Sequence, residues 1–136
     1  MANEAVIIEL TNGGNPIRRT VADGTTISKG TLLVMTDPNT VAASTVTSSA
    51  SVFGGVAAAD KLASDGSTTL AVWQEGCFDM TNAAFGTPSV GALVVLSGAN
   101  LIRAAVAADL LTGAIIGKLE ETAATNEVVR VRLGAN

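Results

Sequence analysis

The stretch ISKGTLLVMTDPN, residues 27–39, decides the fold because a close copy of it, PSVGALVVLSGAN, occupies residues 88–100. Each copy contains a glycine turn, a short apolar run and a polar stop. A shift of 61 positions aligns the turn glycine, two apolar positions and the final asparagine: Gly30 with Gly91, Leu32 with Leu93, Val34 with Val95, and Asn39 with Asn100. Two copies in one small chain indicate that the architecture is repeated.

Two further matches follow in the same order. FGG at 53–55 aligns with IIG at 115–117, and the apolar pair Leu70/Val72 aligns with Val131/Leu133. We therefore predict two degenerate copies of a unit of four or five strands. We expect the two units to close on each other into one barrel or compact sandwich, which would leave no exposed strand edges.

The rest of the chain also predicts an all-β protein, because short runs rich in β-branched residues alternate with glycine-containing or polar turns. VVRVRL at 128–133 alternates apolar and charged side chains, as a half-buried strand does. We expect strands near the following ranges: 5–10, 17–21, 31–35, 52–58, 69–74, 77–80, 92–96, 114–119 and 128–133.

The other segments complete a single predicted domain, residues 1–136. Residues 56–64 and 103–111 are alanine-rich and could each form at most a turn or two of helix. The polar, serine- and threonine-rich stretch 39–51 is predicted to be a long loop. We expect an all-β fold, a compact β-barrel with an internal pseudo-duplication.

Composition narrows the classes of partner. The chain has 136 residues, of which 48% are hydrophobic and only 3% aromatic, so the core consists of small side chains and further burial through self-association is expected. A net charge of −4 and only two short arginine pairs, Arg18-Arg19 and Arg130/Arg132, argue against nucleic acid binding. Neither a secretory signal nor an apolar run of membrane-spanning length is present, so we expect no membrane contact and no secretion.

Few side chains could support catalysis. The sequence has no histidine, no tyrosine and one cysteine, Cys77, which we interpret as a core residue. The carboxylate pairs Asp60/Asp65 and Glu120/Glu121 could act as acid and base, but their polar context favours ordinary solvated charge. Lys29 lies in a predicted turn, where the modified lysine of a biotin or lipoate carrier would lie, but the flanking residues of such a carrier are missing. We therefore expect no enzyme activity, cofactor or metal.

Trp73 is the aromatic residue that stands out. In TLAVWQEG, residues 69–76, it faces the side of its strand opposite to Leu70 and Val72. If those two side chains point into the barrel, Trp73 points out of it. We predict that Trp73 either covers the surface or anchors a subunit interface.

Four segments together resemble the capsid decoration, or cement, proteins of tailed phages, which are small head-stabilising proteins with a β-tulip or β-barrel core. The resemblance runs from Val21 to Leu133. It rests on VADGTTISKGTLLVMTDPNTV (21–41), VFGGVAAADKLASDGSTTLAVWQEGCFDM (52–80), VGALVVLSGANLI (90–102) and TGAIIGKLEETAATNEVVRVRL (112–133).

The resemblance implies a structural virion protein, made in the host cytoplasm, that binds the outer surface of the capsid. It implies a homotrimer at threefold or quasi-threefold positions that bridges neighbouring copies of the major capsid protein. The matching shell contact is the short N-terminal arm, residues 1–5, through Ala2, Asn3, Glu4 and Ala5, although the loop 39–51 could serve instead. The alternative is a ligand- or glycan-binding barrel of a head fibre or adhesion module.

Overall fold

The computed structural model describes residues 3–10, 15–83 and 87–134. Over these residues the chain is all-β, with eleven strands and the short 3-10 helix η2 (Ala107–Leu111). The strands are β1 (Val6–Glu9), β2 (Ile17–Val21), β3 (Leu32–Thr36), β4 (Thr40–Ala43), β5 (Phe53–Ala57), β6 (Thr69–Trp73), β7 (Gly76–Asn82), β8 (Leu93–Gly98), β9 (Leu101–Ala104), β10 (Ile115–Leu119) and β11 (Val128–Leu133).

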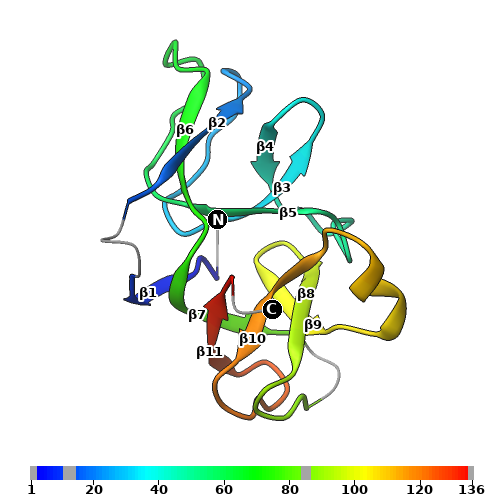
Figure 1. The fold of residues 1–136 in the computed structure, drawn as a ribbon. Helices are drawn as coiled ribbons and strands as arrows, with labels where there is room; N and C mark the ends of the chain where they lie inside the picture. The colour runs from blue at the N-terminus through cyan, green and yellow to red at the C-terminus, as the bar shows by residue number, and fades with distance from the viewer. Residues whose placement is uncertain (1–2, 11–14, 84–86, 135–136) are drawn as a thin grey trace.

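The strands form two five-stranded barrels that lie one above the other in Figure 1. The first barrel closes in the order β2-β4-β3-β5-β6. The second follows the order β7-β11-β10-β8-β9 and closes because β7 also pairs with β9. Strand β1 lies outside both rings and pairs with β7 in antiparallel fashion. The all-β class and the barrel are thus confirmed, but each repeat closes on itself, and the two do not combine into one barrel.

The internal repeat extends to individual strand pairs. In each barrel one pair of strands is parallel, β2 with β4 in the first and β7 with β9 in the second. These are the first and third strands of each repeat along the chain, and the other four pairings are antiparallel. Adding 61 to the residue numbers of two pairs in the first barrel gives two pairs in the second: Thr20–Thr40 becomes Thr81–Leu101, and Leu33–Ala43 becomes Val94–Ala104. The predicted pseudo-duplication is therefore a property of the backbone as well as of the sequence.

A β-bulge recurs at the same place in each barrel and explains the matched FGG and IIG segments. The register of β5 with β3 shifts around Gly54, and that of β10 with β8 shifts around Ile116. The residue after each bulge is a glycine. A Cβ on Gly117 would lie 1.9 Å from the carbonyl oxygen of Arg132, and a Cβ on Gly55 would lie 2.3 Å from Val72. Only glycine allows the strands to approach so closely.

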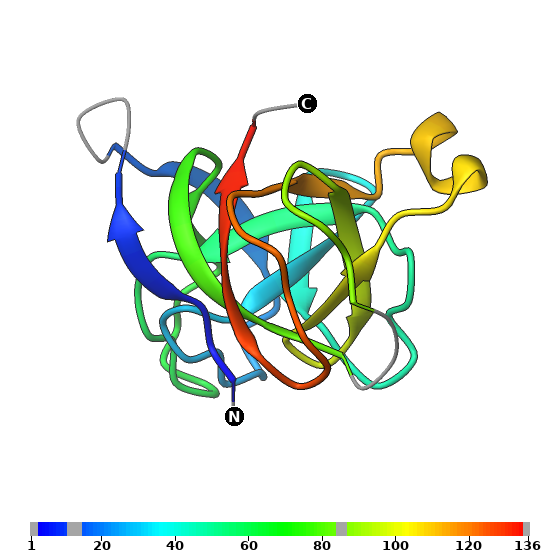
Figure 2. The ribbon, with the colours of Figure 1, turned by 90° about the horizontal axis from the view of Figure 1, so that it is seen from below.

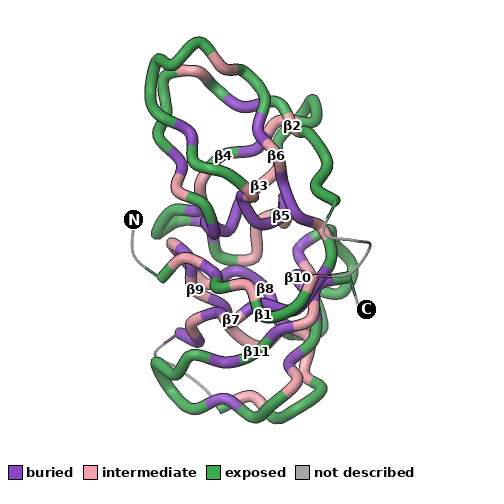
Figure 3. Tube along the Cα trace, turned by 90° about the vertical axis from the view of Figure 1, so that its left-hand side faces the viewer, coloured by how far each residue is buried: buried purple, intermediate pink, exposed green. Residues whose placement is uncertain are grey.

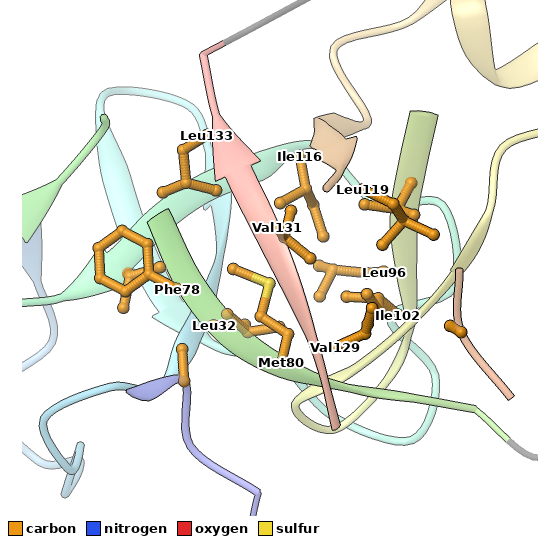
Figure 4. Close-up of a cluster of buried hydrophobic side chains, with 14 of the residues drawn as sticks. Leu32, Phe78, Met80, Leu96, Ile102, Ile116, Leu119, Val129, Val131 and Leu133 are labelled. Carbon is orange, nitrogen blue, oxygen red and sulfur yellow. The ribbon is translucent and has the colours of Figure 1, made fainter. Parts of the chain in front are cut away.

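Two apolar clusters form the core, and the larger one spans both barrels. A small cluster fills the first barrel: Val21, Ile27, Leu33, Val41, Ala57, Leu70 and Val72. A larger cluster fills the second barrel and continues into the junction, where Leu32, Val56 and Trp73 of the first barrel join it. Figure 4 shows Leu32 next to Met80 within this cluster, and Figure 3 shows buried backbone concentrated where the barrels meet. This continuous burial holds the two barrels together.

Three predicted segments differ in the structure. The predicted loop 39–51 contains strand β4, and strand β9 was not predicted; both are four-residue strands that close a barrel, too short for a clear alternation. The predicted helical turn at 56–64 is wrong, because residues 56 and 57 end β5 and Lys61 bridges to Ile27. Within 103–111, the start belongs to β9 and only 107–111 form a helix.

Candidate interaction surfaces

Trp73 faces away from Leu70 and Val72, as its place in the strand predicts, but the second barrel covers it. Its exposed fraction is 7%, and its ring lies 5.8 Å from that of Phe78, the first apolar side chain to enter the second barrel from β7. Trp73 therefore anchors the contact between the two halves of one chain. The prediction of Trp73 as a subunit-interface anchor is corrected accordingly.

The predicted N-terminal arm is fixed to the protein at its last residue. The backbone N–H of Ala5 donates a 2.6 Å hydrogen bond to the carbonyl oxygen of Gly30, in the turn that opens the repeated stretch. Ala5 is buried, Glu4 is half-buried and Asn3 is exposed, whereas Ala2 lies outside the described residues. Of the four predicted contact residues, the described ones thus leave Asn3 and part of Glu4 accessible to a partner.

Strand β1, which follows directly, adds an apolar edge to this region. Its hydrogen-bonding partner is β7, and among the described strands nothing pairs with its other edge. Val6 is 59% exposed and Ile8 is 39% exposed, while Ile7 packs on the core. An open strand edge with apolar side chains is a ready site for another chain to bind. The sequence predicted the strand but not that its edge would be open.

The predicted pair Asp60/Asp65 belongs to a turn built around Lys61. The ammonium of Lys61 is buried and donates to Asp65 Oδ1 at 2.9 Å and to the carbonyl oxygen of Asp23 at 2.9 Å. A backbone hydrogen bond from Ser67, followed by the Lys61 ammonium, lowers the pKa of Asp65 to about 2. Asp60 accepts a 2.7 Å hydrogen bond from the N–H of Lys29. Both carboxylates therefore stabilise backbone turns.

The predicted pair Glu120/Glu121 also has structural contacts. Arg132 donates to Glu120 at 2.9 Å, and this hydrogen bond is the main cause that lowers the pKa of Glu120. Glu121 accepts from the N–H of Arg130 at 3.0 Å. Cys77, beside Glu120, is a buried core residue as predicted, and burial raises the pKa of its thiol. A raised pKa keeps the thiol protonated and unreactive.

The remaining candidate groups also have structural surroundings. The ammonium of Lys29 lies 5.6 Å from the centre of the Trp73 ring, a cation–π distance that accounts for this turn lysine. Trp73 and Phe78 are buried and Phe53 packs against the core, so these three offer no exposed stacking platform for a sugar. Phe85 lies outside the described residues. Among the described residues no cluster of acidic or sulfur side chains could hold a metal, and no helix is suited to span a membrane.

A second apolar surface, which sequence reasoning missed, lies on the loop between β9 and β10. This loop, residues 105–114, contains η2 and projects from the second barrel (Figure 2). Val106 is 58% exposed, Leu110 53% and Leu111 90%. Asp109 organises the loop, since its carboxylate accepts from the N–H of Val106 at 3.0 Å and pairs with Arg103 at 3.1 Å. The fixed loop thus presents exposed leucines, which single out a contact surface.

Comparison with known proteins assigns no role to these surfaces. No protein-family model matches the chain, and no curated protein matches its sequence at a significant level.

Proposed function

We propose that this chain is a structural virion protein that binds the outer surface of a tailed-phage capsid. In this proposal it stabilises the shell by bridging neighbouring copies of the major capsid protein, and it assembles as a homotrimer at threefold or quasi-threefold positions. The resemblance of residues 21–133 to capsid decoration proteins supports this function, as does the wholly structural use of the charged side chains described above.

The observation that carries the proposal is the anchored, open edge of the N-terminal strand. The hydrogen bond from Ala5 to Gly30 fixes the point where the segment leaves the first barrel, and Val6 and Ile8 then face solvent along β1. A partner strand could pair with this edge and cover both side chains. Because Ala5 is fixed, little ordering entropy opposes that contact. Many such copies on one shell would add their contacts by avidity.

The test is co-sedimentation of the purified chain with expanded, DNA-free shells of the phage that encodes it, followed by thermal rupture of the decorated shells. We expect binding and a higher rupture temperature. The double variant Val6→Lys/Ile8→Lys keeps a strand of exposed side chains but replaces its apolar edge, so binding should fall at least about tenfold, the equivalent of ~1.4 kcal/mol.

Val128→Lys is the matched control, because Val128 is an apolar residue of β11 with a similar exposure of 56%. It should bind shells as the natural chain does. A folded natural chain that fails to sediment with the shells would refute the function. Equal loss of binding in the control and in the β1 variant would refute the assignment to β1.

A further inference from the structure

The two barrels of one chain are joined by a contact that involves different surfaces on each side. The first barrel contributes the start of β3 and the loop between β4 and β5, residues 44–52. The second contributes the turn between β8 and β9, and β9 itself. Asn100 of that turn accepts from the N–H of Leu32 at 2.9 Å, and its own N–H donates to Ser44 Oγ at 3.0 Å. The contact is therefore head-to-tail.

Two more contacts come from the loop itself. The N–H of Ala50 donates to the carbonyl oxygen of Leu96 at 3.0 Å, and Arg103 Nε donates to Ser49 Oγ at 3.4 Å. The loop of the first barrel thus binds β8 and β9 of the second. We call residues 44–52 the docking loop, and the surface formed by β8, β9 and their connecting turn the receiving face.

The second barrel carries a corresponding loop with the same pattern of capping hydrogen bonds. In the docking loop, the side chain of Ser48 accepts from the N–H of Thr45 at 2.8 Å. Sixty-one positions later, the side chain of Asp109 accepts from the N–H of Val106 at 3.0 Å. The backbone bonds that follow in each loop also match: Ser48 to Thr45 and Ser51 to Ser48, then Asp109 to Val106 and Thr112 to Asp109. The second barrel therefore has a docking loop of its own, residues 105–114. The end of this loop contacts the first barrel, where the N–H of Phe53 donates to the carbonyl oxygen of Gly113 at 3.1 Å, whereas Val106, Leu110 and Leu111 are exposed.

The first barrel, in turn, has an open receiving face. Its turn between β3 and β4 contains Asn39, which corresponds to Asn100 and has the same left-handed backbone, with φ of 51° against 57°. Asn100 is completely buried, whereas Asn39 is exposed, as are Pro38 before it and Ala42 in β4. One chain thus exposes the leucines of one docking loop and the turn of one receiving face, on opposite barrels.

The side chains of the two exposed surfaces differ from their counterparts in the contact within the chain. Ser49 and Arg103, which bond within the chain, correspond to Leu110 and Ala42. Ala50 and Leu96 correspond to Leu111 and Met35. A polar pair has therefore become an apolar pair, and a small residue on the loop has become a large exposed leucine. Leu110 and Leu111 on the loop and Ala42 and the half-buried Met35 on the receiving face would form an apolar contact, and its burial would supply the main driving force for association.

We infer that copies of this chain associate head-to-tail, with the loop 105–114 of one copy bound to the β3–β4 face of the next. Leu110 packs against Ala42 of the next copy, and Leu111 against Met35. The contact follows, between chains, the placement of the docking loop on the receiving face within a chain. It does not include the hydrogen bonds of Asn100, because Asn39 accepts from Arg19 of its own chain and the counterpart of Ser44 is Ala105. Such a heterologous contact forms a ring if its rotation closes. This contact would provide the subunit interfaces of the proposed trimer. The inference rests on the proposed function only for the number of copies, three in a closed ring.

The test is the mass of the purified chain by light scattering or analytical ultracentrifugation over a concentration series. The natural chain should exceed its monomer mass of 13.6 kDa as the concentration rises. Leu110→Asp removes the loop surface, and Ala42→Asp removes the receiving face. Each variant alone should remain monomeric where the natural chain is assembled, with at least about a tenfold weaker association.

An equimolar mixture of the two variants separates this contact from a symmetric one. Each variant retains the surface that the other lacks, so the mixture should form dimers and nothing larger. Dimer formation also shows that both variants are folded. Leu62→Asp is the control, since Leu62 is 67% exposed in the first barrel, outside both surfaces, and should assemble as the natural chain does.

The inference is overturned if the natural chain stays monomeric over the whole series, if either single variant assembles normally, or if the folded variants stay monomeric when mixed. Urea unfolding of each variant establishes that it is folded. Shell binding is measured separately. Assembly without shell binding would contradict the proposed shell binding alone, whereas shell binding without assembly would contradict this inference and the homotrimer and leave the shell binding in place.

Discussion

Asn100 Oδ1 lies 2.9 Å from the backbone nitrogen of Leu32 and joins the β8–β9 turn of the second barrel to the start of β3 in the first. The same oxygen accepts from the hydroxyl of Ser44 at 3.3 Å, and Asn100 is fully buried. A buried amide of the second barrel that satisfies two donors of the first fixes the relative position of the barrels, because any other arrangement would leave those donors without partners.

Asn100→Ala should therefore destabilise the fold by about 2–4 kcal/mol, since it leaves the Leu32 N–H and the Ser44 hydroxyl buried without an acceptor. Urea unfolding at low protein concentration measures the loss. Asn39→Ala is the matched control, because Asn39 has the same left-handed backbone but is exposed, so the backbone strain of alanine is common to both. Equal losses in the two variants would show that the contact between the barrels contributes nothing.

Gly117→Ala should destabilise the second barrel strongly. The new Cβ would lie 1.9 Å from the carbonyl oxygen of Arg132, and only movement of the backbone could relieve that overlap. We expect a loss of roughly 3 kcal/mol or more in the free energy of unfolding. Gly24→Ala, at a turn where a Cβ meets nothing within 4 Å, should change stability by no more than about 1 kcal/mol.

Much of this fold can be predicted from the repeat, because the repeated residues are those with strict geometric roles. Gly30 and Gly91 have positive φ, and Gly55 and Gly117 follow the bulges. Strands β4 and β9 could not be predicted, because each is short and its pairing is decided by distant strands. Closure of each repeat into its own barrel depends on those same two strands, which explains why a single barrel was expected.

The candidate surfaces were harder to predict than the fold. The alternation of β6 correctly placed Trp73 outside its own barrel, but nothing local indicates that another barrel covers it. The exposure of Leu110 and Leu111 was missed because an alanine- and leucine-rich run has the composition of a buried helix. Comparison of the loop 44–52 with its copy would have indicated the change from serine and alanine to leucine.

Trp73→Ala should act on folding, because the ring is buried against Phe78 between the barrels. Truncation of a buried tryptophan costs about 3–5 kcal/mol, and the urea midpoint should fall accordingly. The natural chain should also show tryptophan fluorescence that shifts to longer wavelength on unfolding, since Trp73 is its only tryptophan. Leu62→Ala, which truncates an exposed side chain, is expected to stay within about 0.5 kcal/mol. A Trp73→Ala chain of natural stability would show that the ring is not packed there.

Asp65 should make the stability of the first barrel depend on pH in the acid range. Its folded-state pKa of about 2 lies below the ordinary value of 3.8, so the native state favours the ionised carboxylate. That stabilisation is present above about pH 4 and is lost as the pH falls toward 2, where the carboxylate is protonated in both states. The measurement is the urea midpoint of the natural chain and of Asp65→Asn between pH 6 and pH 2. The natural chain should be the more stable at pH 6, and the difference should shrink through the acid window.

Lys61→Met should keep part of this pH dependence, because Ser67 still donates to Asp65 at 2.9 Å. A difference that stays constant down to pH 2 would show that the ionisation of Asp65 does not stabilise the fold.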